Sequence, residues 1–110
     1  VRATGRTAAN DARGEWMISH VHVVLGRPDM ARHHAERTLA IVEAADLQDF
    51  DRAYAHEALA RAAAAGGRLD EARAARERAA AVPIADEEDR QIFVDDLAAE
   101  PWFGLSADVV

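Results

Sequence analysis

The stretch GRPDMARHHAERTLAI at residues 26–41 recurs as GRLDEARAARERAAAV at residues 67–82, a constant offset of 41 residues. Eight of the aligned positions are identical, beginning with Gly26 and Gly67. Self-similarity at a fixed period of this length is typical of helical repeats. Such repeats stack and bury their cores against one another, and their surfaces serve mainly for binding. The sequence therefore predicts an all-α protein that interacts with other molecules.

Apolar spacing, capping residues and helix breakers together predict five helices and no strands. We expect residues 1–9 to be a disordered lead-in, residues 10–105 to form a single helical domain and residues 106–110 to be a flexible tail. The expected helices are Asn10 or Asp11 to about Leu25, Pro28 to about Ala45, about Asp51 to Ala65, about Leu69 to Ala81, and a fifth that Asp86 caps and Pro101 ends.

The spacing of apolar residues also predicts which faces are buried. In the first helix the predicted inner stripe is large and aliphatic, whereas in the second it is mostly small. We expect Asp51 to cap the third helix. The predicted inner residues are Ile18, Val21 and Leu25 with Met17 and Val24 between them, then Ala31, Ala35, Thr38, Leu39 and Val42, and finally Ile92, Phe93 and Leu97 in the fifth helix.

Within residues 53–82 a large and a small residue stand side by side, a glycine closes the turn, and two small residues follow in the next helix. These positions are Leu59, Ala60, Gly67, Ala72 and Ala79, and an earlier unit matches at Ile18, Ser19, Gly26, Ala31 and Thr38. With this pattern residues 53–82 resemble a tetratricopeptide repeat, and the resemblance extends over residues 12–82. The period of 41 is longer than the ~34 residues typical of the family, and Arg76 stands where an aromatic residue is usual.

This resemblance implies two antiparallel helical hairpins that form a short α-solenoid, with the fifth helix as a cap. It also implies a peptide-binding groove along the first helix of each unit. Transferred residue by residue, that groove would consist of Trp16, His20, Tyr54, Glu57 and Arg61. An aromatic residue beside a charged pair is a usable set of contacts for a peptide. The alternative is that these residues pack beneath the fifth helix or across a dimer.

The net charge of −7 is confined to one end of the chain. Residues 1–83 hold twelve acidic residues and twelve arginines, whereas residues 84–110 hold eight acidic residues and one arginine. Because nucleic-acid binding requires an excess of positive charge, we expect no nucleic-acid partner. The simplest role of the acidic end is a solvated helix that favours solubility.

The chain has no cysteine and therefore neither disulfides nor thiolate metal sites. No apolar run approaches the ~18–20 residues that span a bilayer, and no signal peptide is evident. We therefore expect no membrane partner and a cytoplasmic location. All 13 basic residues are arginine, which together with the many alanines suggests a GC-rich bacterial genome, and the chain resembles small bacterial proteins of this repeat type.

The five histidines are the only candidates for a metal site, and their spacing argues against one. No pair stands four apart, as two helical ligands require; a cluster of His20, His34 and His56 from different helices remains the alternative. Ser19 and His20 are adjacent and would not face each other, and no phosphate-binding loop is present. We expect no cofactor, no metal and no enzymatic activity.

The function that best fits the sequence is a protein–protein interaction scaffold with a protein or peptide partner. A second hypothesis makes the chain a fragment of a larger signalling or transcription regulator, and a third rests on metal binding by histidines. We also expect a homodimer, because a two-repeat solenoid leaves an end uncovered. That end offers Met17, Val21, Val24 and Met30, while Trp102–Leu105 either folds back or crosses to a second subunit.

Overall fold

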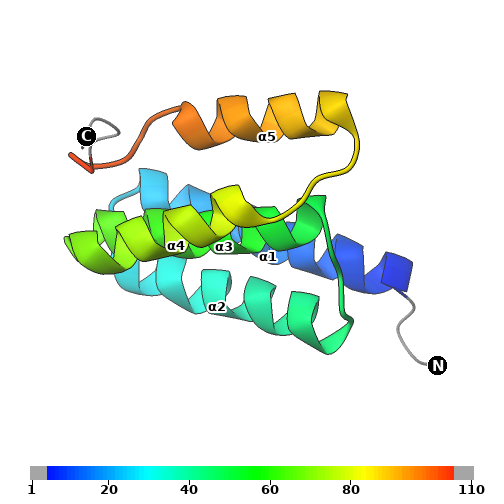
Figure 1. The fold of residues 1–110 in the computed structure, drawn as a ribbon. Helices are drawn as coiled ribbons and strands as arrows, with labels where there is room; N and C mark the ends of the chain where they lie inside the picture. The colour runs from blue at the N-terminus through cyan, green and yellow to red at the C-terminus, as the bar shows by residue number, and fades with distance from the viewer. Residues whose placement is uncertain (1–4, 106–110) are drawn as a thin grey trace.

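The computed structural model describes residues 5–105, and within that range it contains five α-helices and no strand (Figure 1). The predicted all-α class is therefore confirmed. Helices α1 to α4 lie together, and α5 runs along one side of this four-helix body (Figure 1). The helices are α1 (Gly5–Val24), α2 (Pro28–Ala44), α3 (Phe50–Ala65), α4 (Leu69–Ala81) and α5 (Glu87–Ala98).

The α1–α2 turn and the α3–α4 turn have the same backbone structure, 41 residues apart. Gly26 and Gly67 have φ values of +73° and +78°, which glycine adopts without steric cost. The amide of Arg27 donates to the carbonyl of His22 at 2.8 Å, and the amide of Arg68 donates to the carbonyl of Ala63 at 2.9 Å. These are the hydrogen bonds of a Schellman C-cap, so the sequence echo corresponds to a repeated turn.

Two helix starts differ from the prediction. Helix α1 begins at Gly5, so residues 5–9 belong to the helix and not to a lead-in. Asp49, and not Asp51, caps α3: its side chain accepts a hydrogen bond from the amide of Phe50. Asp51 instead lies in the first turn of α3 and forms an ion pair with Arg13. The predicted cap of α5 is confirmed, because Asp86 accepts from the amide of Asp89. The expected tail at 106–110 lies outside the described residues.

Small residues allow the helices to approach one another closely. The Ser19 hydroxyl is fully buried and donates to the carbonyl of Ala31 at 2.8 Å, joining α1 to α2. Their counterparts 41 residues later, Ala60 and Ala72, are also fully buried and share one apolar cluster. Helix α1 also packs on α3, α2 packs on α3, and α3 packs on both α4 and α5. Alanine supplies most of this core, so each buried side chain contributes little area.

The predicted inner stripe of α1 is wrong. The large aliphatic residues at 17, 18, 21, 24 and 25 are 42–62% exposed. The buried residues are Ala8, Ala12, Ser19 and Val23, on roughly the opposite face of the helix. Periodicity alone selected the face with the larger side chains, whereas the close contact of α1 with α2 and α3 requires small ones. Ile18 is accordingly not a buried repeat position. The predicted inner face of α2 is correct for four residues, and Leu39 is half-buried.

The C-terminal segment, residues 99–105, folds back onto its own chain. Trp102 and Leu105 are buried against the alanines of α3 and α4, with Leu59 half-buried beside them. In α5, Phe93 packs against Ala53 and Ala79, as predicted for the inner face. Ile92, expected to face inward, is 47% exposed. Among the described residues, no helix is long and apolar enough to cross a membrane.

We expect Ala72→Leu to lower the free energy of unfolding by about 1–3 kcal/mol, because the added carbons overpack a fully buried position. Ala74→Leu is the matched control, since Ala74 is exposed on the same helix and both changes keep a strong helix former. Denaturant unfolding followed by circular dichroism measures both variants. Equal stability of the two would show that α4 does not pack as described.

Candidate functional site

A buried ion pair lies beneath Trp16, where α1, α3 and α5 meet. Glu57 and Arg61, one turn apart on α3, are 2% and 3% exposed. The Arg61 Nε–H donates to the Glu57 carboxylate. The other carboxylate oxygen accepts a 2.7 Å hydrogen bond from the indole Nε1–H of Trp16 on α1. The carboxylate is therefore paired at both oxygens, which a buried charge requires.

Arg61 also holds the C-terminal segment. Its NH1 donates to the carbonyls of Ala99 and Pro101, both at 3.0 Å, and its NH2 donates to the carbonyl of Asp96 at 2.6 Å. The last carbonyls of a helix have no partner within it and carry partial negative charge. Arg61 supplies a donor to the carbonyls of Ala99 and Pro101, just beyond α5, and a second donor to the carbonyl of Asp96, which also accepts from the amide of Ala99. The guanidinium also lies over the Trp102 ring, with 4.1 Å from its carbon to the ring centroid.

Arg76 supports the same segment from α4. Its NH2 donates to the carbonyl of Leu97 at 3.2 Å, and the indole of Trp102 donates to that carbonyl at 2.9 Å. The Arg76 guanidinium lies 4.3 Å from the Trp102 ring centroid. Burial, followed by the nearby charge of Arg61, lowers the pKa of Arg76. Each contact between a cation and the indole ring is favourable, whereas the two guanidinium charges repel each other.

This burial corrects the predicted groove. The structure brings all five predicted residues into one neighbourhood, but the C-terminal segment covers Arg61, and Glu57 is buried with its carboxylate bonded to Trp16 and Arg61, so neither side chain is open to a peptide. The other three are half-buried. The Trp16 ring stacks on His20 with centroids 5.4 Å apart, and it meets Tyr54 edge-on at 5.5 Å. The part of the groove that stays open is therefore aromatic.

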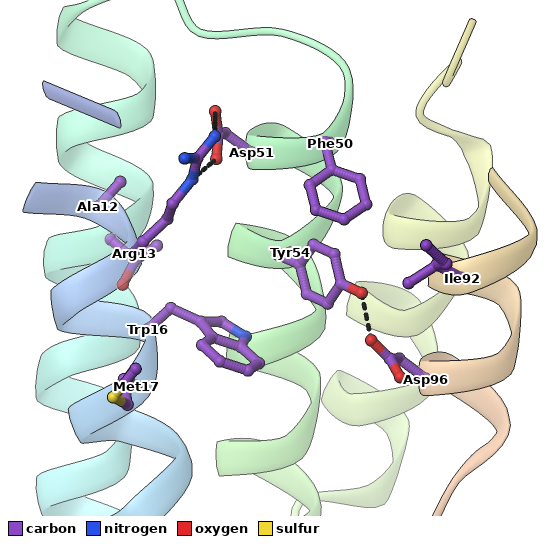
Figure 2. Close-up of a pocket in the computed structure, with 10 residues that line it drawn as sticks. Ala12, Arg13, Trp16, Met17, Phe50, Asp51, Tyr54, Ile92 and Asp96 are labelled. Atoms are coloured by element: carbon purple, nitrogen blue, oxygen red, sulfur yellow. Dashed lines mark hydrogen bonds and ion pairs between the residues drawn. The ribbon is translucent and has the colours of Figure 1, made fainter. Parts of the chain in front are cut away.

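An apolar pocket of about 330 Å³ opens between α1, α3 and α5. Figure 2 shows Trp16 on α1 across from Tyr54 on α3, with Phe50 and Ile92 on the far side. Met17 and Ile92, 59% and 47% exposed, stand at its edge. The complete lining is Ala12, Arg13, Trp16, Met17, Thr38, Phe50, Asp51, Tyr54, Ile92 and Asp96.

Two carboxylates line this pocket, and in the described chain only that of Asp51 forms an ion pair. The Arg13 Nε lies 2.9 Å from an Asp51 carboxylate oxygen, so that pair is balanced. On the α5 side, the Tyr54 hydroxyl donates to the Asp96 carboxylate (Figure 2). No arginine or histidine in the described chain forms an ion pair with Asp96. Burial and Asp96 raise the pKa of Tyr54, which keeps the phenol protonated as a donor.

Sequence reasoning missed several lining residues. Phe50 was assigned to a loop, Ile92 to the core and Asp96 to a solvated face. An available signal was the spacing of Ile92 and Asp96, which are four apart and therefore on one side of α5. Nothing in the sequence indicates that this side of α5 faces α1 across the pocket, because the position of α5 depends on the buried contacts of Arg61.

The five histidines lie on three helices, α1, α2 and α3. His22 stacks on His34 with ring centroids 5.7 Å apart, and His34 Nδ1 lies 2.6 Å from a Glu15 carboxylate oxygen. His56 is half-buried, and burial, followed by the charges of Arg78 and Arg52, lowers its pKa. Between residues 5 and 105, no three potential ligands are placed to hold a metal ion.

Comparisons with the models of known protein families, with curated proteins and with solved structures find no match to this chain.

We expect Arg61→Met to lower the free energy of unfolding by about 3–5 kcal/mol, because it leaves the Glu57 carboxylate buried without its cation. Arg73→Met is the control, since Arg73 forms only an exposed pair with Asp70 and such pairs contribute less than about 1 kcal/mol. The double variant Glu57→Met with Arg61→Met should recover part of the loss. Chemical denaturation measures all four proteins, and similar costs at Arg61 and Arg73 would contradict the assignment.

Glu15 should make stability depend on pH in the acid range. Hydrogen bonding to His34, reinforced by Arg37 and partly opposed by burial, holds the pKa of Glu15 below its ordinary value of 4.5. A carboxyl whose pKa is lower in the folded state stabilises fully above its unfolded pKa, and the contribution disappears as pH falls through the folded pKa.

We therefore expect wild-type stability to fall more steeply than that of Glu15→Gln between about pH 5 and pH 3. Glu36→Gln, which removes an exposed pair with Arg32, should keep the wild-type slope. Urea titrations at each pH measure the free energy of unfolding. Parallel curves for wild type and Glu15→Gln would refute the role of this carboxylate.

Proposed function

We propose that the chain is a non-catalytic scaffold of the tetratricopeptide-repeat type, which binds a peptide segment of a partner protein in the pocket between α1, α3 and α5. The observation that carries the proposal is an open pocket with aromatic side chains, which lies beside the buried Glu57–Arg61 ion pair. The repeated Schellman turns and the small-residue contacts Ser19–Ala31 and Ala60–Ala72 support the repeat assignment. The lengthened period and the covered Glu57–Arg61 pair distinguish this chain from the pattern of the family.

The pocket fits one apolar side chain of a partner. Three aromatic residues, Trp16, Phe50 and Tyr54, line it, and large apolar anchors that fill such pockets supply most of the energy at protein interfaces. Trp16 is fixed by its hydrogen bond to Glu57, and Tyr54 by its hydrogen bond to Asp96. Both side chains are thus held in place before a ligand arrives, which reduces the entropy lost on binding.

The charge at the pocket favours a basic segment. Asp96 lacks a cationic partner in the described chain, and residues 84–110 carry eight acidic residues against one arginine. A partner segment with arginine or lysine beside its apolar anchor would complement this edge. We therefore propose an amphipathic, basic peptide as the ligand class.

The test uses a fluorescent peptide with one leucine or phenylalanine anchor between arginines, and a matched peptide with glutamates in place of the arginines. We expect the basic peptide to bind at least about tenfold more tightly, and the difference to shrink at high salt. Fluorescence anisotropy measures both affinities.

Two substitutions on α5 then localise the binding. Ile92→Arg adds a charge at the pocket edge and should weaken the basic peptide by about tenfold or more. Val94→Arg adds the same charge at a residue of similar exposure outside this pocket, and should have a much smaller effect. Equal effects of the two variants, or equal affinity for the basic and acidic peptides, would overturn the proposal.

A further inference from the structure

Helix α1 presents an apolar face that no other part of the described chain covers. We define the outer face of α1 as Gly14, Met17, Ile18, Val21, Val24 and Leu25, all of which are exposed. Together with Met30, which is 45% exposed at the start of α2, the large residues expose on the order of 500 Å² of apolar surface. This lies in the upper part of the range for the largest patch on a monomer, and such patches mark interaction sites.

Gly14 gives a second, independent indication that the outer face of α1 is an interaction site. It lies inside α1, where glycine is less favourable than alanine. A Cβ at Gly14 would meet nothing within 4 Å, so no contact within the described chain requires a glycine there. Glycine on an exposed helix face does permit close approach of another backbone. Gly14 shares its side of the helix with Val21, two turns further along.

We propose that two copies of this chain associate through the outer face of α1, with the two α1 helices antiparallel about a twofold axis. A twofold contact uses the same patch on both copies and therefore requires self-complementarity. In the register that sets Met17 opposite Ile18 of the second copy, Gly14 falls opposite Val21 of the second copy. The absent side chain on one helix thus accommodates the valine of the other, and this happens twice.

Charge also favours the outer face of α1 over α5 as the place where two copies meet. Each copy carries −7, but residues 1–83 are balanced, with twelve acidic residues and twelve arginines. Two copies that meet through α1 therefore join their neutral parts, whereas contacts through the acidic α5 would bring like charges together. An antiparallel pair of helices also places the positive end of each helix dipole near the negative end of the other.

The area of this contact is small for a dimer. Burial of the outer face and of Met30 on both copies removes on the order of 1,000 Å² of apolar surface, near the lower limit for specific interfaces. We therefore expect a weak dimer, with a dissociation constant in the micromolar range. Met17 belongs both to the pocket edge and to the outer face of α1, so each proposal is tested at a residue outside the other site: Ile92 for the pocket and Val21 for the dimer.

Sedimentation equilibrium and light scattering at increasing protein concentration test the dimer. We expect the mass to approach twice the 11.9 kDa of one chain. Val21→Glu should raise the dissociation constant at least about tenfold, because it places two carboxylates in the interface. Val94→Glu is the matched control, since Val21 and Val94 are each 49% exposed, and it should leave dimerisation unchanged.

Gly14→Leu separates association from folding. Leucine is a much better helix former than glycine, so the melting temperature of the dilute monomer should rise. The same side chain blocks close approach of the second helix, so the dimer should weaken. A structural role for Gly14 within one chain would lower the melting temperature instead. A single-chain mass throughout the micromolar range would overturn the proposal, as would dimerisation unaffected by both Val21→Glu and Gly14→Leu.

Discussion

The arrangement of the other elements depends on the ion pair and hydrogen bonds that the Arg61 guanidinium forms. A buried cation is tolerated only when its charge and its donors are paired. Here Nε–H meets the Glu57 carboxylate, and the remaining nitrogens meet three carbonyls at and beyond the end of α5. Glu57 in turn accepts from Trp16 on α1. One side chain thus connects α1, α3 and the C-terminal segment.

This connection compensates for a core made largely of alanine. Small residues let α1 to α4 pack closely, but each buries little apolar area. The C-terminal segment adds Trp102 and Leu105, which are 2% and 3% exposed against the alanines of α3 and α4. Because Arg61 and Arg76 both lie over the Trp102 ring, the largest buried side chain is positioned by the same cations that satisfy the end of α5. The same contacts of Arg61 and Arg76 therefore stabilise the fold and fix the position of α5.

The pocket follows from this position. Arg61 holds one end of α5, Phe93 packs beneath its middle, and the Tyr54–Asp96 hydrogen bond joins it to α3. Helix α5 consequently forms a wall that faces Trp16 on α1 across an open space (Figure 2). Binding at this site would act on side chains whose positions are already fixed.

Local signals in the sequence predicted local structure well. Gly26, Gly67 and Pro28 placed the turns and helix starts, and the small positions Ser19 and Ala72 proved to be buried. The resemblance to the tetratricopeptide repeat implied that Trp16, His20, Glu57 and Arg61 share one neighbourhood. In the structure they do so, with Glu57 and Arg61 buried. The buried face of α1 was assigned wrongly because both of its faces are apolar, and spacing cannot distinguish small packing residues from large exposed ones.

Long-range contacts could not be predicted in the same way. Arg61 binds backbone carbonyls, which every residue has, so no residue type in the C-terminal segment identifies them. The covering of Arg61 and the wall formed by Ile92 both depend on those contacts. The echo at 41 residues describes α1 to α4 and contains no information on α5.

Hydrogen exchange of the two indole N–H protons, followed in one NMR spectrum, tests the role of Arg61 most directly. Trp102 donates to the carbonyl of Leu97 and Trp16 donates to Glu57, so each proton reports one side of the connection. If Arg61 holds the C-terminal segment, both indole protons exchange slowly, and the Trp102 proton exchanges nearly as slowly as the core amide protons of α3. Exchange of the Trp102 proton at the rate of an unfolded chain, with α3 still protected, would show that Arg61 does not hold the C-terminal segment.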